Sequence, residues 1–263
     1  MILGRVGYSF FMGIQLVGVT LSFIFFLSLG TFLFYPLVNS NLTGPGFVKL
    51  MTSISLTGFC IVIALFGVLH SFVLDSSLIS LILMAFFSIL FYLYHKEQRT
   101  YFSWILYFLI LASGIYYILQ TQHASFYFLS LAFLGIVNYM MILGHYYLVV
   151  PKLSVRPLIL GHYIFWPLIG FKICLSYFSY EQTKLFFEEG SLLGQGYIFN
   201  MLLISMRILW GYVALVVLSY FSYRLCKMRS TQSATGVLYI MVFFVLVGEL
   251  LSLYLLDLTG HYL

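Results

Sequence analysis

Three charged residues lie within otherwise apolar stretches in the second half of the chain: Lys172, Arg207 and Glu249. Counted inward from the ends of their stretches at the rise of an α-helix, they lie about 12, 15 and 10 Å deep. An ionised side chain in hydrocarbon is costly unless it is paired or hydrated, so such residues normally face the interior of a helical bundle. We therefore expect one buried charge cluster, with Arg207 and Glu249 as an ion pair.

A proline close to Lys172 strengthens the functional interpretation of this cluster. Pro167 removes a helical hydrogen bond and predicts a kink five residues before Lys172. Interrupted helices near the membrane midplane often line ion or substrate sites, which favours an ion- or proton-coupled transporter or channel. The alternative is structural: the ion pair only holds two helices together, and Lys172 extends outward to the membrane surface.

Two of the six histidines predict a second kind of chemistry. His145 and His162 lie on neighbouring apolar stretches at nearly equal depth, and each follows a glycine, Gly144 or Gly161. Neutral imidazole is the commonest metal ligand and a good axial ligand for haem iron, and glycine leaves room for a bulky group. The pair therefore predicts a site for haem b or a transition metal. The alternative is that both are hydrogen-bonded side chains at the membrane interface.

A third candidate site is polar and opens the last apolar stretch at Arg229, Ser230, Thr231 and Gln232. The free N–H groups and the dipole of a helix start favour an anion, and Arg229, together with Arg156, adds positive charge. A lipid phosphate, a quinone carbonyl or another anionic ligand fits this chemistry. The alternative is an ordinary helix start capped by hydroxyl side chains.

These residues must be positioned by helices, because lipid cannot satisfy an unpaired backbone. Asp75 is a good N-cap, and Pro157 suits the first turn of a helix. The sequence predicts an all-α, polytopic transmembrane bundle in one integral membrane domain (1–263), with a scaffold half (1–122) and a half that carries the intramembrane polar residues (123–263). The expected spans are 9–35, 46–70, 76–95, 101–120, 124–149, 157–180, 197–223 and 233–256.

The composition excludes other classes of protein. The chain has 263 residues, of which 63% are hydrophobic and only 7% charged, and its mean hydropathy is +1.08. A soluble domain is about 25% charged, and disordered chains are polar, so neither class fits. The net charge of +5 arises mainly from residues that flank apolar stretches, so the bilayer, and not nucleic acid, is the expected partner.

The basic residues also predict an orientation. Eight of the twelve lie in or beside the connections that follow odd-numbered spans, whereas Arg5 and Lys184 lie toward the other side. Because Lys and Arg collect on the cytoplasmic side, both termini are expected to be external. The predicted location is a cytoplasmic membrane or the inner membrane of an organelle.

Three classes of function are compatible with these features. The first is a membrane redox component that uses His145 and His162 for haem or metal, with quinone at the polar start of the last span. The second is a transporter or channel built on Lys172, Arg207 and Glu249. The third is a non-catalytic subunit of a membrane complex. The redox class is placed slightly ahead because it uses both histidines. No Ser-His-Asp, HExxH or Walker pattern occurs, so hydrolases and nucleotide-driven pumps have no support.

Overall fold

The chain folds into a bundle of long helices. A computed structural model describes residues 2–37, 45–70, 73–94, 100–150, 154–191 and 196–263, with the backbone alone for 2–12, 14 and 45. Within these ranges, eight helices are long and apolar enough to cross a membrane, as the sequence predicts. The protein is therefore a multi-pass, all-α membrane protein.

Each predicted apolar stretch corresponds to one membrane-spanning helix, and short helical turns complete the structure. The elements in chain order are α1 (Ile2–Leu33), η1 (Tyr35–Leu37), α3 (Pro45–His70), α4 (Ser76–Tyr94), α5 (Tyr101–Leu119), α6 (Ala124–Val149), α7 (Arg156–Gln182), η2 (Lys184–Phe187), α8 (Tyr197–Ile208), η3 (Leu209–Ala214), α9 (Leu215–Lys227) and α10 (Thr231–Thr259). The start of α4 has the expected cap, because the Leu78 N–H donates to Asp75 Oδ1 over 2.8 Å. Pro157 lies in the first turn of α7.

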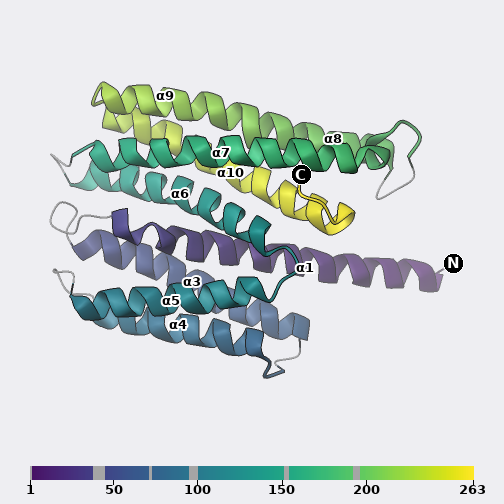
Figure 1. The fold of residues 1–263 in the computed structure, drawn as a ribbon, viewed down its shortest axis with the longest axis horizontal. Coiled ribbons are helices and arrows are strands. Elements are labelled where there is room, and N and C mark those ends of the chain that lie inside the picture. The colour runs from purple at the N-terminus through teal and green to yellow at the C-terminus, as the bar shows by residue number, and fades with distance from the viewer. Residues whose placement is uncertain (1, 38–44, 71–72, 95–99, 151–153, 192–195) are drawn as a thin grey trace.

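The start of α1 and the end of α10 lie at the same end of the bundle, called the termini end below (Figure 1). This arrangement follows from an even number of spans joined by short connections. The loop charges predict that the opposite end is cytoplasmic. Three of the basic residues behind that prediction, Lys96, Arg99 and Lys152, lie outside the described residues.

Helix α6 occupies the centre of the bundle, between α1 with α3–α5 on one side and α7–α10 on the other (Figure 1). The most apolar stretch of α6 is 78% buried, against 33–44% for the other spans. Its closest neighbour is α1, because Gly30 and Gly135 allow the two backbones to touch. A Cβ atom built on Gly135 would lie only 2.2 Å from the Gly30 carbonyl oxygen. Small residues at such contacts are typical of helix packing in membranes.

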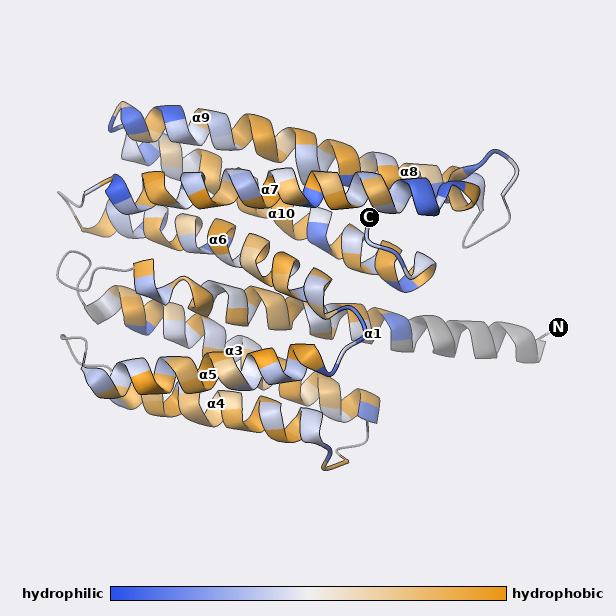
Figure 2. Cartoon of the chain, viewed as in Figure 1, coloured by the Kyte–Doolittle hydropathy of each residue, from blue (hydrophilic) through white to orange (hydrophobic). Residues whose placement is uncertain are grey.

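Apolar residues predominate along the helices, and polar residues gather toward the helix ends and connections (Figure 2). Examples of exposed apolar residues are Phe108 on α5, Phe171 on α7 and Phe243 on α10. In water, such a surface would promote aggregation, whereas in lipid it matches the acyl chains. The outer surface is therefore that of a membrane-embedded bundle.

The seventh span differs from the uninterrupted helix expected over 197–223. It contains a π-helical segment, η3, between α8 and α9. Helix α7, in contrast, continues through Pro167 as a single helix. The π-helical turn thus lies in the span that carries Arg207, whereas α7 remains one helix across Pro167.

Candidate functional site

The structure brings Lys172, Arg207 and Glu249 together in one fully buried network. Lys172 Nζ lies 2.7 Å from Glu249 Oε2, and Arg207 Nη1 lies 3.3 Å from Glu249 Oε1. The relative exposure of the three side chains is 0–1%. Glu249 therefore accepts from both cations, one through each carboxylate oxygen, and Lys172 does not extend to the membrane surface.

Lys172 is held by α6 and by aromatic rings as well as by Glu249. Its ammonium donates to Ser130 Oγ over 3.0 Å. It also lies 5.0 Å from the ring centroid of Phe133 and 5.5 Å from that of Tyr262. Burial raises the pKa of the Tyr262 phenol well above its usual range, so this ring stays neutral beside the ammonium. The aromatic faces add electrostatic stabilisation where water is absent.

Arg207 makes further hydrogen bonds in three directions. Nη1 donates to the Gly248 carbonyl oxygen over 3.0 Å, Nη2 donates to Tyr212 Oη over 2.8 Å, and Nε donates to a main-chain oxygen of Leu263 over 3.3 Å. The Ser252 hydroxyl donates to the same Leu263 oxygen. The planar guanidinium thus connects α8, η3, α10 and the segment that follows α10, which a point charge such as lysine does not do.

The π-helical turn is what allows Tyr212 to reach Arg207. In a regular α-helix, side chains five positions apart point about 140° away from each other. In this span the Tyr212 ring lies 4.3 Å from the guanidinium carbon of Arg207. The same turn places Gly211 against Gly248 on α10, where a Cβ on Gly248 would lie 2.7 Å from the Gly211 Cα. Close backbone packing and an irregular turn together bring the guanidinium to the α10 backbone.

The charges of the three side chains do not cancel. Two are cationic and one is anionic at neutral pH, which leaves one positive charge in excess among them. Buried charges are expensive even when paired, and helix association alone does not require them. A cavity of about 360 Å³ opens beside the network between α7 and α8, with Ser176, Arg207 and Tyr212 among its lining residues. The buried ionic network therefore borders a cavity through Arg207 and Tyr212.

The two histidines of the predicted cofactor site have different neighbours. His162 is fully buried, with Nδ1 2.8 Å from the Leu158 carbonyl oxygen and its ring near Trp166 and Tyr223. His145 is exposed on α6, and its Nδ1 lies 2.7 Å from Tyr239 Oη on α10. Each histidine is thus held by its own partners.

The room expected beside the two glycines is filled by protein side chains, which corrects that part of the prediction. A Cβ on Gly161 would lie 2.6 Å from Met140 Cγ, and one on Gly144 would lie 3.1 Å from Thr235 Oγ1. Thr235 also donates to the Gly144 carbonyl oxygen over 2.9 Å. These glycines allow α6, α7 and α10 to pack closely. Within the described residues, no group of three or more His, Cys, Asp or Glu side chains is placed to hold a metal ion.

The predicted anion or quinone site is partly assembled. Arg229 and Thr231 line a cavity of about 530 Å³ together with Arg156, between the starts of α7 and α10. Ser230 and Gln232 are not among its lining residues. Ser230 precedes α10 without capping it through its side chain, and its hydroxyl bonds to Ser233 Oγ instead. The two arginines therefore converge as expected, whereas the hydroxyl groups serve local structure.

Two members of the charge network were not singled out from the sequence. Ser130 is one of many hydroxyl residues in the apolar stretches, so its type carries no signal. Tyr212 lies five positions after Arg207, a spacing that does not place two side chains on one α-helical face. Only the proximity of Gly211 to the charged residue hinted at close packing there.

Comparison of the chain with protein-family models, with curated proteins and with solved structures finds no match. The fold and the site define the class of the molecule: a multi-pass helical membrane protein with a buried ionic network. Its function is argued below from its own residues.

Proposed function

We propose that this protein is a proton-coupled transporter or channel for a small solute, with Lys172, Arg207 and Glu249 as its coupling centre. The observation that carries the proposal is a carboxylate with no exposure, held between two cations from different spans. Ionisable groups within membrane-spanning segments are rare, face the bundle interior and typically mark ion pathways and proton relays.

The network has two protonation states that differ in how tightly the helices are held. In the first, Lys172 is an ammonium and bonds to the Glu249 carboxylate over 2.7 Å. In the second, one proton has left Lys172, so the neutral amine no longer attracts the carboxylate as a charge, and Arg207 remains the cation that holds Glu249. Loss of the proton thus weakens the contact between α7 and α10 but keeps that between α8 and α10. A step that couples proton release to helix movement follows from this difference.

Two features of the neighbouring backbone support a moving part. The π-helical turn at Leu209–Ala214 interrupts the regular hydrogen-bond ladder directly after Arg207. Pro167 removes one backbone donor from α7, just before Lys172. Irregular turns of this kind are frequent at functional sites and in the discontinuous helices of transporters.

Proton flux into liposomes tests the proposal. Purified protein is reconstituted with a pH-sensitive dye inside the vesicles, and a potassium diffusion potential drives the protons. Wild-type vesicles should change their internal pH faster than protein-free vesicles. Glu249→Gln and Lys172→Arg should return the rate to that of protein-free vesicles. The arginine variant is the sharper of the two, because it keeps the buried positive charge but cannot release a proton.

A matched control is Glu181→Gln, which removes a carboxylate from the exposed end of α7. This variant should keep the wild-type rate. Circular dichroism and size-exclusion chromatography of each variant establish that it folds. Wild-type flux in folded Lys172→Arg and Glu249→Gln proteins would contradict the assignment of these residues, and so would a wild-type protein that moves no protons.

A second candidate, the redox component, is favoured by one observation at His162. With Nδ1 bonded to the Leu158 oxygen, the buried Nε2 atom finds no hydrogen-bond partner among the described residues. A free imidazole lone pair held by a backbone bond at the other nitrogen is how ligating histidines are usually oriented. Haem b or a transition metal would bind there, and a quinone would occupy the cavity between Arg156 and Arg229.

A visible absorption spectrum and metal analysis of the purified protein test this candidate. A Soret band, or a bound metal, that disappears in His162→Ala and persists in His70→Ala would support it. A purified wild-type protein that contains neither haem nor metal would exclude it.

A further inference from the structure

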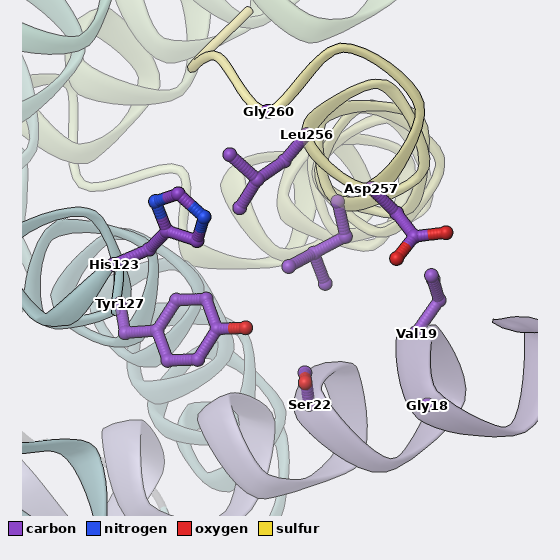
Figure 3. Close-up of a pocket in the computed structure, with 9 residues that line it drawn as sticks. Gly18, Val19, Ser22, His123, Tyr127, Leu256, Asp257 and Gly260 are labelled. Atoms are coloured by element: carbon purple, nitrogen blue, oxygen red, sulfur yellow. The ribbon is translucent and has the colours of Figure 1, made fainter. Parts of the chain in front are cut away.

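A second polar cavity lies at the termini end of the bundle, between α1, α6 and α10. It has a volume of about 320 Å³ and is lined by residues of all three helices and by His123, directly before α6. Figure 3 shows four polar side chains around it: Ser22 from α1, His123 and Tyr127 from the α6 side, and Asp257 from α10. Sequence patterns did not single out this cavity, because its polar residues come from three distant segments.

The chemistry of the lining favours a small organic cation. Asp257 is an exposed residue that lines the cavity, and its carboxylate forms no salt bridge within the described residues, so it is available to a cation. The hydroxyl groups of Ser22 and Tyr127 add two oxygen acceptors, and Val19, Leu253 and Leu256 supply apolar walls. A primary ammonium has three N–H donors, which suit one carboxylate and two hydroxyl oxygens. A transition metal is disfavoured, since a single histidine and a single carboxylate make an incomplete ligand set.

The cavity and the buried charge network are neighbours along α6 and α10, with the cavity nearer the termini end. Tyr127 lines the cavity, and Ser130, one turn further along α6, bonds to Lys172. On α10, Leu253 lines the cavity one turn from Glu249. Asp257 is about 12 Å from Glu249 along the helix axis, at 1.5 Å per residue. A charge bound in the cavity is therefore close enough to interact electrostatically with the charged side chains of the network.

Acidic residues also concentrate at this end of the molecule. Five of the seven Asp and Glu residues of the chain belong to it: Asp75, Glu181, Glu188, Glu189 and Asp257. Asp75 directly precedes Ser76, whose hydroxyl donates to Gln120 Oε1. Gln120 is three residues before His123 in the sequence, so Asp75 lies at the same end of the bundle as the cavity. Against these five, Lys184 and Arg5 are the Lys and Arg residues assigned to this end, so acidic residues are in excess there, and such an excess raises the local concentration of cations.

We infer that this cavity, formed by Ser22, His123, Tyr127 and Asp257, is the substrate site of the transporter and that it binds a small primary ammonium compound. The inference rests on the proposed function and names its substrate class. A bound cation and the Lys172 ammonium repel each other across about two helical turns. Cation binding therefore favours release of the Lys172 proton, which couples the cavity to the charge network.

Binding of methylammonium to the protein in nanodiscs, with no gradient present, tests the site. Wild-type protein should bind it saturably and should prefer it to tetramethylammonium, which has no N–H donors. Asp257→Asn removes a charge-assisted hydrogen bond and should weaken binding about 10- to 100-fold.

A pair of glycine variants tests the cavity itself. Gly18 lines it, and a Cβ on Gly18 meets no atom within 4 Å, so Gly18→Leu fills the space without disturbing the fold. Gly13→Leu is the matched control, because Gly13 is on the same helix, also meets no atom within 4 Å and does not line the cavity. Binding should be lost in the first variant and kept in the second.

The outcomes for the cavity and for the charge network can be told apart. Glu249→Gln should still bind methylammonium saturably, because Glu249 does not line the cavity, but should fail to move protons. No saturable binding by the wild type, binding unchanged in Asp257→Asn or Gly18→Leu, or competition by Zn²⁺ with a preference for the metal would each overturn the inference. Normal binding together with proton flux that does not depend on Glu249 would contradict the proposed function alone.

Discussion

The two halves of the bundle are similarly apolar but bury different polar groups. In the described part of α1–α5, every buried polar residue outside the aromatic class is a serine or threonine, as Thr52 and Ser88 illustrate. In α6–α10 the buried polar residues include Lys172, Arg207 and Glu249. The first half therefore buries neutral hydroxyl groups, whereas the second half also buries charged groups that need partners.

A hydroxyl group can donate its hydrogen bond to a backbone carbonyl oxygen of its own helix, and most of the buried hydroxyl groups in the first half do so. Thr52 donates to the Val48 carbonyl oxygen over 2.8 Å, and Ser88 donates to that of Met84 over 2.7 Å. Such bonds add little between helices. A buried charge has no partner of this kind in its own helix, so it must reach another one. The comparison shows that close packing holds the first half together, whereas the second half also contains an ionic junction that a proton can change.

The largest effect on stability is expected from the ionic junction. Glu249→Ala leaves two buried cations without their carboxylate and should lower the free energy of unfolding by about 3–5 kcal/mol. Unfolding in mixed detergent micelles measures it. If Arg207→Ala with Glu249→Ala keeps fold and flux better than either single variant, the pair is only structural. The protein would then belong to the third class, a non-catalytic subunit.

A smaller effect is expected from close packing at the border of the two halves. Gly30→Ala places a Cβ 2.2 Å from the Leu131 carbonyl oxygen, so α1 and α6 must separate. Overpacking of this kind costs about 1–3 kcal/mol. Gly170→Ala is the control, because a Cβ there meets no atom within 4 Å. If both variants were equally stable, the border would be looser than the structure indicates.

The smallest effect is expected from a single neutral hydrogen bond in the first half. Tyr107 Oη donates to the Leu33 carbonyl oxygen over 2.9 Å, between α5 and α1. Bonds of this type in membrane proteins average about 0.6 kcal/mol, so Tyr107→Phe should cost about that much in the same unfolding assay. Tyr101→Phe, at a 92% exposed position, should cost nothing. A cost similar to that of Glu249→Ala would remove the distinction between the halves.

Much of the fold is predictable from residue types alone. The spans follow from continuous apolar stretches, and Asp75 and Pro157 identify two helix starts through local chemistry. The site is predictable only in part. Depth places Lys172, Arg207 and Glu249 at similar levels, and the cost of isolated charge brings them together. For His145 and His162, similar depth does not determine which way a side chain points around its helix, and the structure gives each histidine its own hydrogen-bond partner.

Residue types along the chain determined that this protein is a bundle of eight helices with three charges in its interior, because hydrocarbon tolerates neither an open backbone nor an unpaired ion. Tertiary structure alone decided that Glu249 bonds to both cations, that a π-helical turn brings Tyr212 to Arg207, and that Ser22, Tyr127 and Asp257 surround one cavity. These contacts depend on how helices far apart in sequence rotate and how closely they approach. Packing of bulky side chains against glycines determines both.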